Sequence, residues 1–458
     1  MLFCMLNKTN FFFNPLNRQN MKNTPVNYDI VTEKIGECNI PNVGKASIRE
    51  IKKLVDLIEE ATGIKYIRME MGIPGLPAAA VGIEAEIEAL RNGVASVYPD
   101  IHGIKPLKKE ISLFVKNFMG IDVSEEGCLP TVGSMQGGFA AFMTLGRSNA
   151  EKDTTLFLDP GFPVHKQQLR VLGQKFDSFD VYNYRGEKLR EKLESHLASG
   201  KVHSMLYSNP NNPSWICFTE TELKIIGELA TKYDVVVLED LAYFGMDFRT
   251  DISTPGQPPY QPSVANYCDN YILFISSSKA FSYAGQRCGM MVISNTLFTR
   301  EFPDLKRFYS SSQFGYAMVF GTLYSLSSGV THSAQYGVAA ILRAANNGEY
   351  NFVHETLEYG EKAKIMKKLF TNNGFRIVYD MDEDKPIADG FYFTISYPGM
   401  SGEELTGHLI YYGISAITLG ITGSERLEGL RACVSLVSRE QFPALEDRLR
   451  QFHKDFGQ

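Results

Sequence analysis

From about residue 130 onward, short apolar runs alternate with helical segments, and this alternation limits the possible folds more than any other feature. Each run is continuously hydrophobic, which is typical of a strand buried on both faces. Such strands separated by helices predict an α/β fold with a mainly parallel sheet covered on both sides. Ligands collect at the carboxyl ends of strands in sheets of this kind. The runs are TTLFLDP, SMLYSNP, DVVVLED, NYILFIS and MMVIS, and the helical segments between them are VHKQQLRVLG, EKLREKLESHLAS and ETELKIIGELATKY.

The length of the chain predicts two domains. It has 458 residues, 44% of them hydrophobic, whereas a single core stops growing near roughly 250–300 residues. An amphipathic helix ending at Gly63 precedes a loop rich in glycine and proline, and helical patterns over 307–326, 333–348 and 353–374 precede a final mixture of strands and helices. The predicted parts are an irregular arm (1–26), an N-terminal segment joining the small domain (27–80), a large domain (81–325) and a C-terminal small domain (326–458).

Composition argues against several classes of protein. The net charge is −6 and neither half is strongly basic, so a nucleic-acid surface is not indicated. The seven cysteines form no CxxC pair, which indicates reduced thiols in the cytoplasm and no metal site. No apolar stretch reaches the roughly 18–20 residues of a membrane span, and the first residues lack the features of a signal peptide. We expect a disordered arm there, or an upstream start codon with Met21 as the natural start.

Lys279 follows the buried run NYILFIS in a stretch rich in hydroxyl groups, ISSSKAFSYAGQRCGM. Burial lowers the pKa of a lysine because it disfavours the charged form, and the neutral amine can attack an aldehyde. Arg287 follows between two glycines, and with Ser276 and Ser278 it would suit a phosphate dianion. A surface loop with solvated side chains is the alternative interpretation of this segment.

Two further segments also end apolar runs. Asp240, in VVVLEDLAYFGM, is a carboxylate at a buried strand end, where it needs a positive partner such as a protonated ring nitrogen. An aspartate that caps the next helix is the alternative. Asn212 lies in MLYSNPNNPSW, whose prolines restrict the turn and can fix an amide side chain, although such a segment is also an ordinary turn.

The remaining segments suit a phosphate and a planar ring. In PTVGSMQGGFAAFMTLG a glycine and small residues run into a helix, which exposes backbone N–H groups to an anion. Phe162, in LDPGFPVHKQQ, could stack on a flat ring, although most phenylalanines fill a core.

In this order the segments resemble the class I and II aminotransferase family, the fold-type I enzymes that use pyridoxal 5′-phosphate (PLP). The resemblance runs from about Tyr28 to the C-terminus and rests on a glycine loop, an aromatic residue, N-P-x-N-P, D-x-A-Y, S-x-S-K, G-x-R-x-G and a late arginine. It implies a large domain with a mainly parallel, seven-stranded sheet between helices, and a smaller α/β domain.

The resemblance also implies the catalytic and cofactor-binding residues. Lys279 matches the lysine that forms the internal aldimine with PLP and later moves the proton between the substrate Cα and the cofactor. Asp240 matches the carboxylate on the pyridine nitrogen, and Tyr243 and Asn212 match the pair that binds the 3′-oxygen. Phe162 matches the stacking aromatic. The residues implied at the phosphate are Gly133, Ser134, Met135, Ser276 and Arg287.

Three further residues match positions around the substrate and the subunit interface. Arg431, in GLRACVSLV, matches the arginine that binds the substrate carboxylate, and Gly72 matches the backbone that closes over the substrate together with Asn212. Tyr98 matches a tyrosine that reaches the phosphate of a second subunit, which implies a homodimer with shared active sites. An ordinary buried tyrosine is the alternative for that position.

The sequence departs from the family pattern at Trp215, the only tryptophan of the chain, which stands where the family has a glycine. It could form a wall of the site. No motif marks a second arginine for a distal carboxylate, and we interpret Arg300 and Arg307 as solvated helix residues.

We therefore expect transfer of an amino group from an amino acid to a 2-oxo acid. The same scaffold also permits β-elimination by a C–S lyase, or decarboxylation. A PLP-sensing regulator is the alternative from another class, but the roughly 25 residues before Asn27 do not form a DNA-binding domain.

Overall fold

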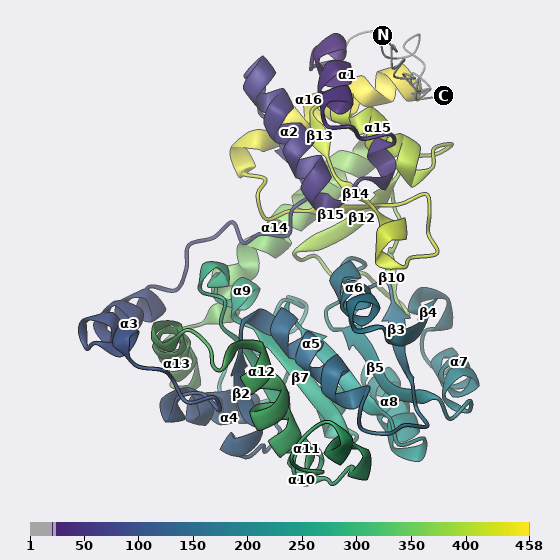
Figure 1. The fold of residues 1–458 in the computed structure, drawn as a ribbon. Coiled ribbons are helices and arrows are strands. Elements are labelled where there is room, and N and C mark those ends of the chain that lie inside the picture. The colour runs from purple at the N-terminus through teal and green to yellow at the C-terminus, as the bar shows by residue number, and fades with distance from the viewer. Residues whose placement is uncertain (1–20, 22–23, 458) are drawn as a thin grey trace, which may run out of the picture.

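The structure, a computed structural model, describes residue 21 and residues 24–457 (Figure 1). The predicted arm over 1–26 therefore lies largely outside the described residues. The described chain forms two units, each built on its own sheet, with helix α14 (Phe352–Asn372) reaching from one to the other (Figure 1).

The larger unit is built on a seven-stranded sheet with the order β2-β8-β7-β6-β5-β3-β4. Neighbouring strands from β7 to β4 run parallel, whereas β8 is antiparallel to both β7 and β2, so the predicted mainly parallel sheet is confirmed. The strands are β2 (Cys128–Thr131), β3 (Thr154–Asp159), β4 (Lys175–Asp180), β5 (Val202–Ser208), β6 (Val236–Leu241), β7 (Tyr271–Ser276) and β8 (Gly289–Ile293).

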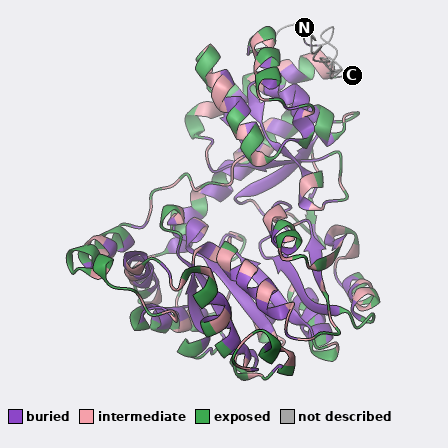
Figure 2. Cartoon of the chain, in the orientation of Figure 1, coloured by how far each residue is buried: buried purple, intermediate pink, exposed green. Residues whose placement is uncertain are grey.

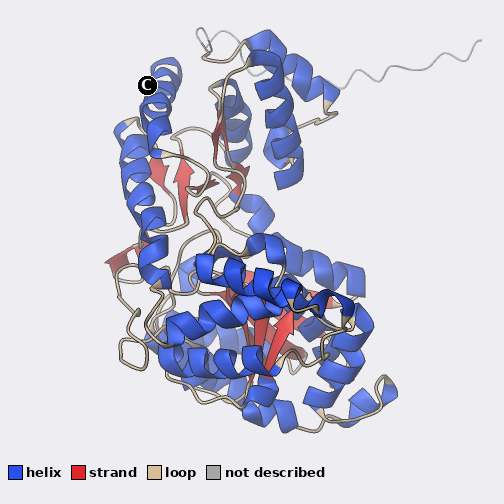
Figure 3. Ribbon diagram, turned by 90° about the vertical axis from the view of Figure 1, so that its left-hand side faces the viewer, coloured by secondary structure: helices blue, strands red, loops and turns tan. Residues whose placement is uncertain are grey.

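Helices cover both faces of this sheet, which explains why its central strands are continuously apolar (Figures 2 and 3). In β7, Ile272 and Phe274 enter one core, whereas Leu273 and Ile275 enter the other. The helices of this unit are α3 (Ala80–Arg91), α4 (Lys105–Met119), α5 (Gly133–Leu145), α6 (Pro163–Leu172), α7 (Lys188–Leu197), α8 (Glu220–Lys232), α9 (Ser277–Ala280), α10 (Asn295–Thr299), α11 (Phe314–Tyr316), α12 (Tyr324–Ser327) and α13 (His332–Asn346).

The smaller unit has a four-stranded antiparallel sheet with the order β14-β15-β12-β9, and the N-terminal segment joins it through the parallel pair β1–β13. Helix α2 has a capping box formed by Ser47 and Glu50, and it stops at the left-handed Gly63 as the sequence predicts. The elements are α1 (Tyr28–Glu37), α2 (Ile48–Thr62), β1 (Ile67–Arg68), β9 (Arg376–Ile377), β10 (Met381–Asp382), β11 (Lys385–Pro386), β12 (Tyr392–Ser396), α15 (Gly402–Tyr411), β13 (Ile414–Ser415), β14 (Ile417–Thr418), β15 (Leu430–Cys433) and α16 (Phe442–Phe456).

The helix predicted over 307–326 is wrong in its first part. Regular helix begins only at Phe314, and a π-helix over Ala317–Leu323 follows. The residues before it include SSS, whose hydroxyl groups compete for backbone hydrogen bonds and disfavour a helix. The predicted domain division at 80/81 and 325/326 stays a prediction; α13 lies beside α3 and α4 in the larger unit.

Ion pairs around the buried Asp382 connect the two units. Asp382, on the hairpin β10–β11, lies 2.9 Å from Nη1 of Arg185 and 2.7 Å from Nη2 of Arg249, both in the larger unit. Tyr379 also donates a 2.6 Å hydrogen bond to Asp180 at the end of β4. Within the described residues, no helix has the length and apolar character needed to cross a membrane.

Candidate active site

The predicted site segments meet at one edge of the seven-stranded sheet. The parallel strands β3, β5, β6 and β7 all end there, and antiparallel β8 begins there because Gly289 pairs with Ser276 and with Thr131. Of the predicted residues, the structure brings to this edge Gly133, Ser134, Met135, Phe162, Asn212, Asp240, Tyr243, Ser276, Lys279 and Arg287.

Lys279 lies in the short helix α9 directly after β7, where its side chain is half-buried. Burial lowers the pKa of its ammonium group, and the nearby Asp240 carboxylate partly offsets this effect. Within the described residues we find no hydrogen bond from the Lys279 amine. The amine is therefore free to react with a ligand at this edge.

Asp240, near the end of β6, is held by two neighbours. One carboxylate oxygen accepts a 3.1 Å hydrogen bond from the backbone N–H of Ala242, and the other lies 3.4 Å from Nε2 of His165. His165 is buried in the first turn of α6, and its Nδ1 lies 3.4 Å from Gln168. Sequence reasoning missed His165, whose only signal was its place three residues after Phe162 in the same segment.

The three asparagines after β5 have different hydrogen-bond partners. Asn209 and Asn211 bond to the backbone of Pro262 and Pro160, which fixes the loop. Asn212 instead directs its side-chain oxygen at Arg431, at 3.4 Å from Nη1. The turn therefore leaves one of its three amides directed at the site.

Arg431 lies on β15 of the smaller unit and is 2% exposed. Besides Asn212, it donates a 2.5 Å hydrogen bond from Nη2 to the backbone oxygen of Glu70, and its guanidinium lies 4.7 Å above the Tyr392 ring. Its Nε is buried without a partner among the described residues. A buried guanidinium with an unused donor fits a carboxylate ligand.

Tyr243 and Tyr392 link the two units. The Tyr243 hydroxyl donates a 2.8 Å hydrogen bond to that of Tyr392. Trp215, with a left-handed φ of 66°, is fully buried and packs edge-on against Tyr243 with ring centroids 5.4 Å apart. A Cβ at Gly72 would lie 2.0 Å from the Tyr392 hydroxyl oxygen, so only glycine permits the backbone to pass there.

A cradle of backbone groups forms where α5 begins. A Cβ at Gly289 would lie 2.7 Å from the backbone nitrogen of Ser134, and a Cβ at Gly133 would lie 2.4 Å from Nη2 of Arg287. Ser276 caps α9 by accepting a hydrogen bond from the N–H of Ser278. These glycines bring free N–H groups and a guanidinium together, as an anionic phosphate requires.

Phe162 is the N-cap residue of α6, and its ring meets the ring of His165 edge-on at 5.7 Å. Because the side chain is only half-buried, one of its surfaces is open to a ligand. Met135, in the first turn of α5, contributes its backbone, whose oxygen accepts a hydrogen bond from Gln168.

Tyr98 lies apart from these residues. It follows α3 in an exposed connection to α4, and 92% of its surface is accessible. The alternative of an ordinary buried tyrosine is therefore wrong.

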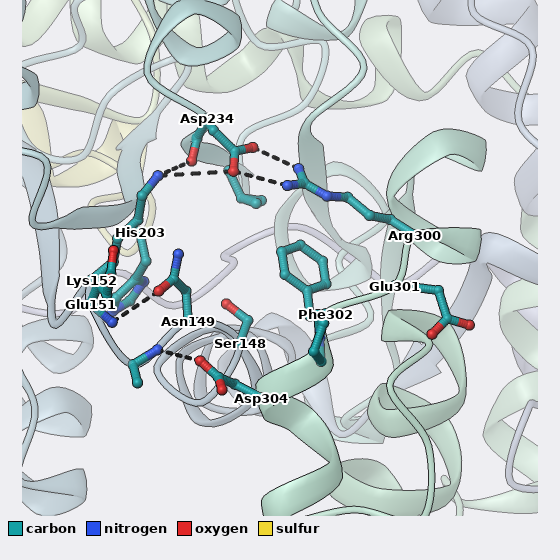
Figure 4. Close-up of a pocket in the computed structure, with 13 residues that line it drawn as sticks. Ser148, Asn149, Glu151, Lys152, His203, Asp234, Arg300, Glu301, Phe302 and Asp304 are labelled. Carbon is teal, nitrogen blue, oxygen red and sulfur yellow. Dashed lines mark hydrogen bonds and ion pairs between the residues drawn. The ribbon is translucent and has the colours of Figure 1, made fainter.

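Arg300 is also remote from the candidate site. It lines a pocket of about 520 Å³ at the opposite edge of the sheet, where β5 and β6 begin (Figure 4). Both of its terminal nitrogens bind the carboxylate of Asp234, at 2.6 and 2.8 Å, and its guanidinium lies over the ring of Phe302. The guanidinium of Arg300 is thus paired with Asp234, away from Lys279.

The residues at the carboxyl edge fit a planar, phosphate-bearing aldehyde. Lys279 supplies an unpaired amine, Asp240 a carboxylate for a ring N–H, and Phe162 an aromatic face. Gly133 and Gly289 keep the phosphate cradle open.

Comparison with known proteins agrees with this geometry. The model of the family described as Aminotransferase class I and II matches residues 65–380. The aspartate aminotransferase of Pyrococcus horikoshii is 24% identical over 409 residues, covering 87% of this chain and 94% of that protein. A probable aspartate aminotransferase of Methanocaldococcus jannaschii is 24% identical over 350 residues, covering 75% and 84%. The solved aspartate aminotransferase of Thermotoga maritima shares the fold with a TM-score of 0.70 at 18% identity, covering 92% and 98%.

Replacing Gly289 with alanine should weaken PLP binding about tenfold or more, because the new Cβ pushes the Ser134 N–H out of the cradle. The dissociation constant would be measured by titrating the cofactor-free protein with PLP. Gly285→Ala is the matched control, since its Cβ would meet no atom within 4 Å. Equal affinities for the two variants would contradict the placement of the phosphate.

Proposed function

The chain belongs to the class I and II aminotransferase family and is therefore a PLP-dependent aminotransferase. We propose that it transfers an amino group from an amino acid to a 2-oxo acid, and that Lys279 is the residue that bonds covalently to the cofactor. The observation that supports this assignment most is the buried, unpaired Lys279 amine beside Asp240. When bound, PLP supplies an electron-withdrawing ring that weakens the bonds to the substrate α-carbon.

Lys279 would act first as a nucleophile and then as a base. Its lowered pKa, caused by burial, keeps a larger fraction of the amine neutral near pH 7 than in an ordinary lysine. Once released by the incoming substrate, the same amine would carry the proton removed from the substrate α-carbon.

Asp240 would bind the protonated ring nitrogen, and His165 would orient the carboxylate for that role. Tyr243 and Asn212 would lie at the 3′-oxygen, and Phe162 would stack on the ring. The phosphate would be held by the residues of the cradle, which are Gly133, Ser134, Met135, Ser276 and Arg287.

Arg431 would bind the substrate carboxylate through the donors left unused in the structure. Asn212 lies between this arginine and the cofactor residues, and the backbone at Gly72 would close the pocket from the N-terminal side. These contacts involve only the carboxylate and so leave the identity of the amino acid open.

We propose a cytoplasmic homodimer with shared active sites. Tyr98 is 92% exposed, and its segment reaches the π-helix through His102, whose ring meets Phe320 at 4.8 Å. Tyr316 and Tyr324, beside the π-helix, are also exposed, at 40% and 56%. Aromatic residues are enriched in the cores of protein–protein interfaces, so a cluster of exposed aromatic side chains supports an interface here.

The assignment of Lys279 is tested by absorbance. The wild-type protein loaded with PLP should show a cofactor band that is lost in Lys279→Ala but kept in Lys175→Ala, whose lysine is exposed. At least one amino acid from a panel should convert the cofactor to pyridoxamine phosphate without release of ammonia. Ammonia and pyruvate from cysteine or cystathionine would instead indicate elimination, and an unchanged band in Lys279→Ala would refute the assignment.

Replacing Arg431 with alanine should raise KM for every amino acid about 100-fold, since two charged hydrogen bonds to the carboxylate are lost. PLP affinity should stay close to that of the wild type. Arg439→Ala, which removes an exposed arginine of the same unit, is the control. Loss of PLP in the Arg431 variant would show that the residue serves the cofactor instead.

Shared sites predict that two damaged chains complement one another. Lys279→Ala lacks the lysine and Tyr98→Ala lacks the tyrosine offered to the other subunit, so a hybrid dimer has one intact site. Random exchange at equal concentrations should restore about a quarter of the wild-type activity per site, assayed at limiting PLP. Absence of any recovery, with hybrids verified by mass, would rule out this role for Tyr98.

A further inference from the structure

Tyr392, the first residue of β12, lies where the proposed substrate and cofactor residues meet. In the pairing of β12 with β15, Tyr392 is opposite Cys433 and Thr394 is opposite Arg431. Side chains two residues apart on a strand share a face, so Tyr392 and Arg431 are diagonal neighbours on one side of the sheet. The sheet itself therefore places the ring under the guanidinium.

The ring of Tyr392 is one of three supports for Arg431. The guanidinium carbon lies 4.7 Å from the ring centroid, while Asn212 and the backbone of Glu70 occupy one donor on each terminal nitrogen. A flat ring beneath a buried cation restricts it to one plane. That plane determines how the remaining donors face a carboxylate.

The hydroxyl group of Tyr392 has a different partner. It accepts the hydrogen bond from Tyr243, which is the residue proposed to bind the 3′-oxygen. A tyrosine hydroxyl has one proton, so Tyr243 can donate to the cofactor only if it becomes an acceptor toward Tyr392. Burial raises the pKa of Tyr392 to about 12, which keeps this second proton available.

Two further contacts hold the Tyr392 ring in place. The backbone at Gly72 passes close to the hydroxyl group, since a Cβ there would lie 2.0 Å from the hydroxyl oxygen. Trp215 packs edge-on against the rings of both Tyr243 and Tyr392, with centroid distances of 5.4 and 6.2 Å. Trp215 adopts a left-handed φ of 66°, a costly conformation for a large side chain, to reach this position.

We propose that Tyr392 is a positioning residue for the reaction: its ring sets the plane of Arg431, and its hydroxyl group donates to Tyr243 so that Tyr243 can donate to the cofactor. The inference rests on the roles proposed for Arg431 and Tyr243. Trp215 supports both rings through its edge-on contacts.

The two functions of Tyr392 can be separated by two substitutions. Tyr392→Phe keeps the ring and removes the hydroxyl, so KM should stay within about twofold of wild type. The pKa read from the absorbance of the PLP-loaded enzyme should rise by roughly 0.5 unit, because a weaker hydrogen bond from Tyr243 stabilises the 3′-oxygen anion less. Tyr392→Leu removes the ring as well and should raise KM for amino acids about fivefold or more.

Tyr397→Phe is the matched control. Tyr397 is a buried tyrosine of the same strand region whose hydroxyl bonds to His453, and it should change neither the absorbance pKa nor KM. Melting temperatures would verify that each variant is folded. If Tyr392→Leu does not fold, Tyr392→Met, which also lacks a ring but fills more of the space, tests the ring through KM, and Tyr392→Phe tests the hydroxyl group.

An unchanged absorbance pKa in Tyr392→Phe would overturn the role of the hydroxyl, and an unchanged KM in folded Tyr392→Leu would overturn the role of the ring. Failure of the proposed function gives a different result. In that case the wild-type protein itself would show no lysine-dependent absorbance band or no transfer of an amino group.

Discussion

Two opposing effects act on the pKa of the Lys279 amine, and the rest of the site depends on their balance. They are burial of the amine and the charge of the Asp240 carboxylate. Burial disfavours the ammonium form, and the carboxylate on the neighbouring strand favours it; burial is the larger effect, so the pKa of Lys279 is lowered. This balance requires that both groups stand at the same edge of the sheet. Parallel pairing of β6 with β7 provides that arrangement, since both strands end at this edge.

The elements that the sequence predicted are those whose burial is uniform. The runs that became β3, β5, β6, β7 and β8 are apolar throughout because helices cover both faces. Edge strand β4, KFDSFD, was missed because its first four residues are not fully buried and three of its residues are charged. Strand β2 is only four residues long and contains Pro130, so its sequence does not predict a strand.

Some site residues could likewise be predicted from local sequence and others could not. Asp240 lies near the end of a strand, and Lys279 and Asn212 come within four residues of strand ends, so local sequence was enough to place them at one edge. His165 and Tyr392 could not be found in that manner, because each becomes significant only through a partner distant in sequence. Trp215 was recognised as unusual, but its position behind Tyr243 depends on the packing of the small unit onto the large one.

Arg431 and Lys279 lie on different units, so the distance between the proposed carboxylate site and the cofactor site depends on how the units dock. Asp382 contacts Arg185 and Arg249 across this junction and is only 4% exposed. A buried ion pair adds little net stability, because desolvation offsets much of the attraction. Separating it, however, would leave an uncompensated charge, which is strongly unfavourable. The pairs around Asp382 therefore act mainly against sliding of one unit over the other, and they keep the ring of Tyr392 in register with Tyr243.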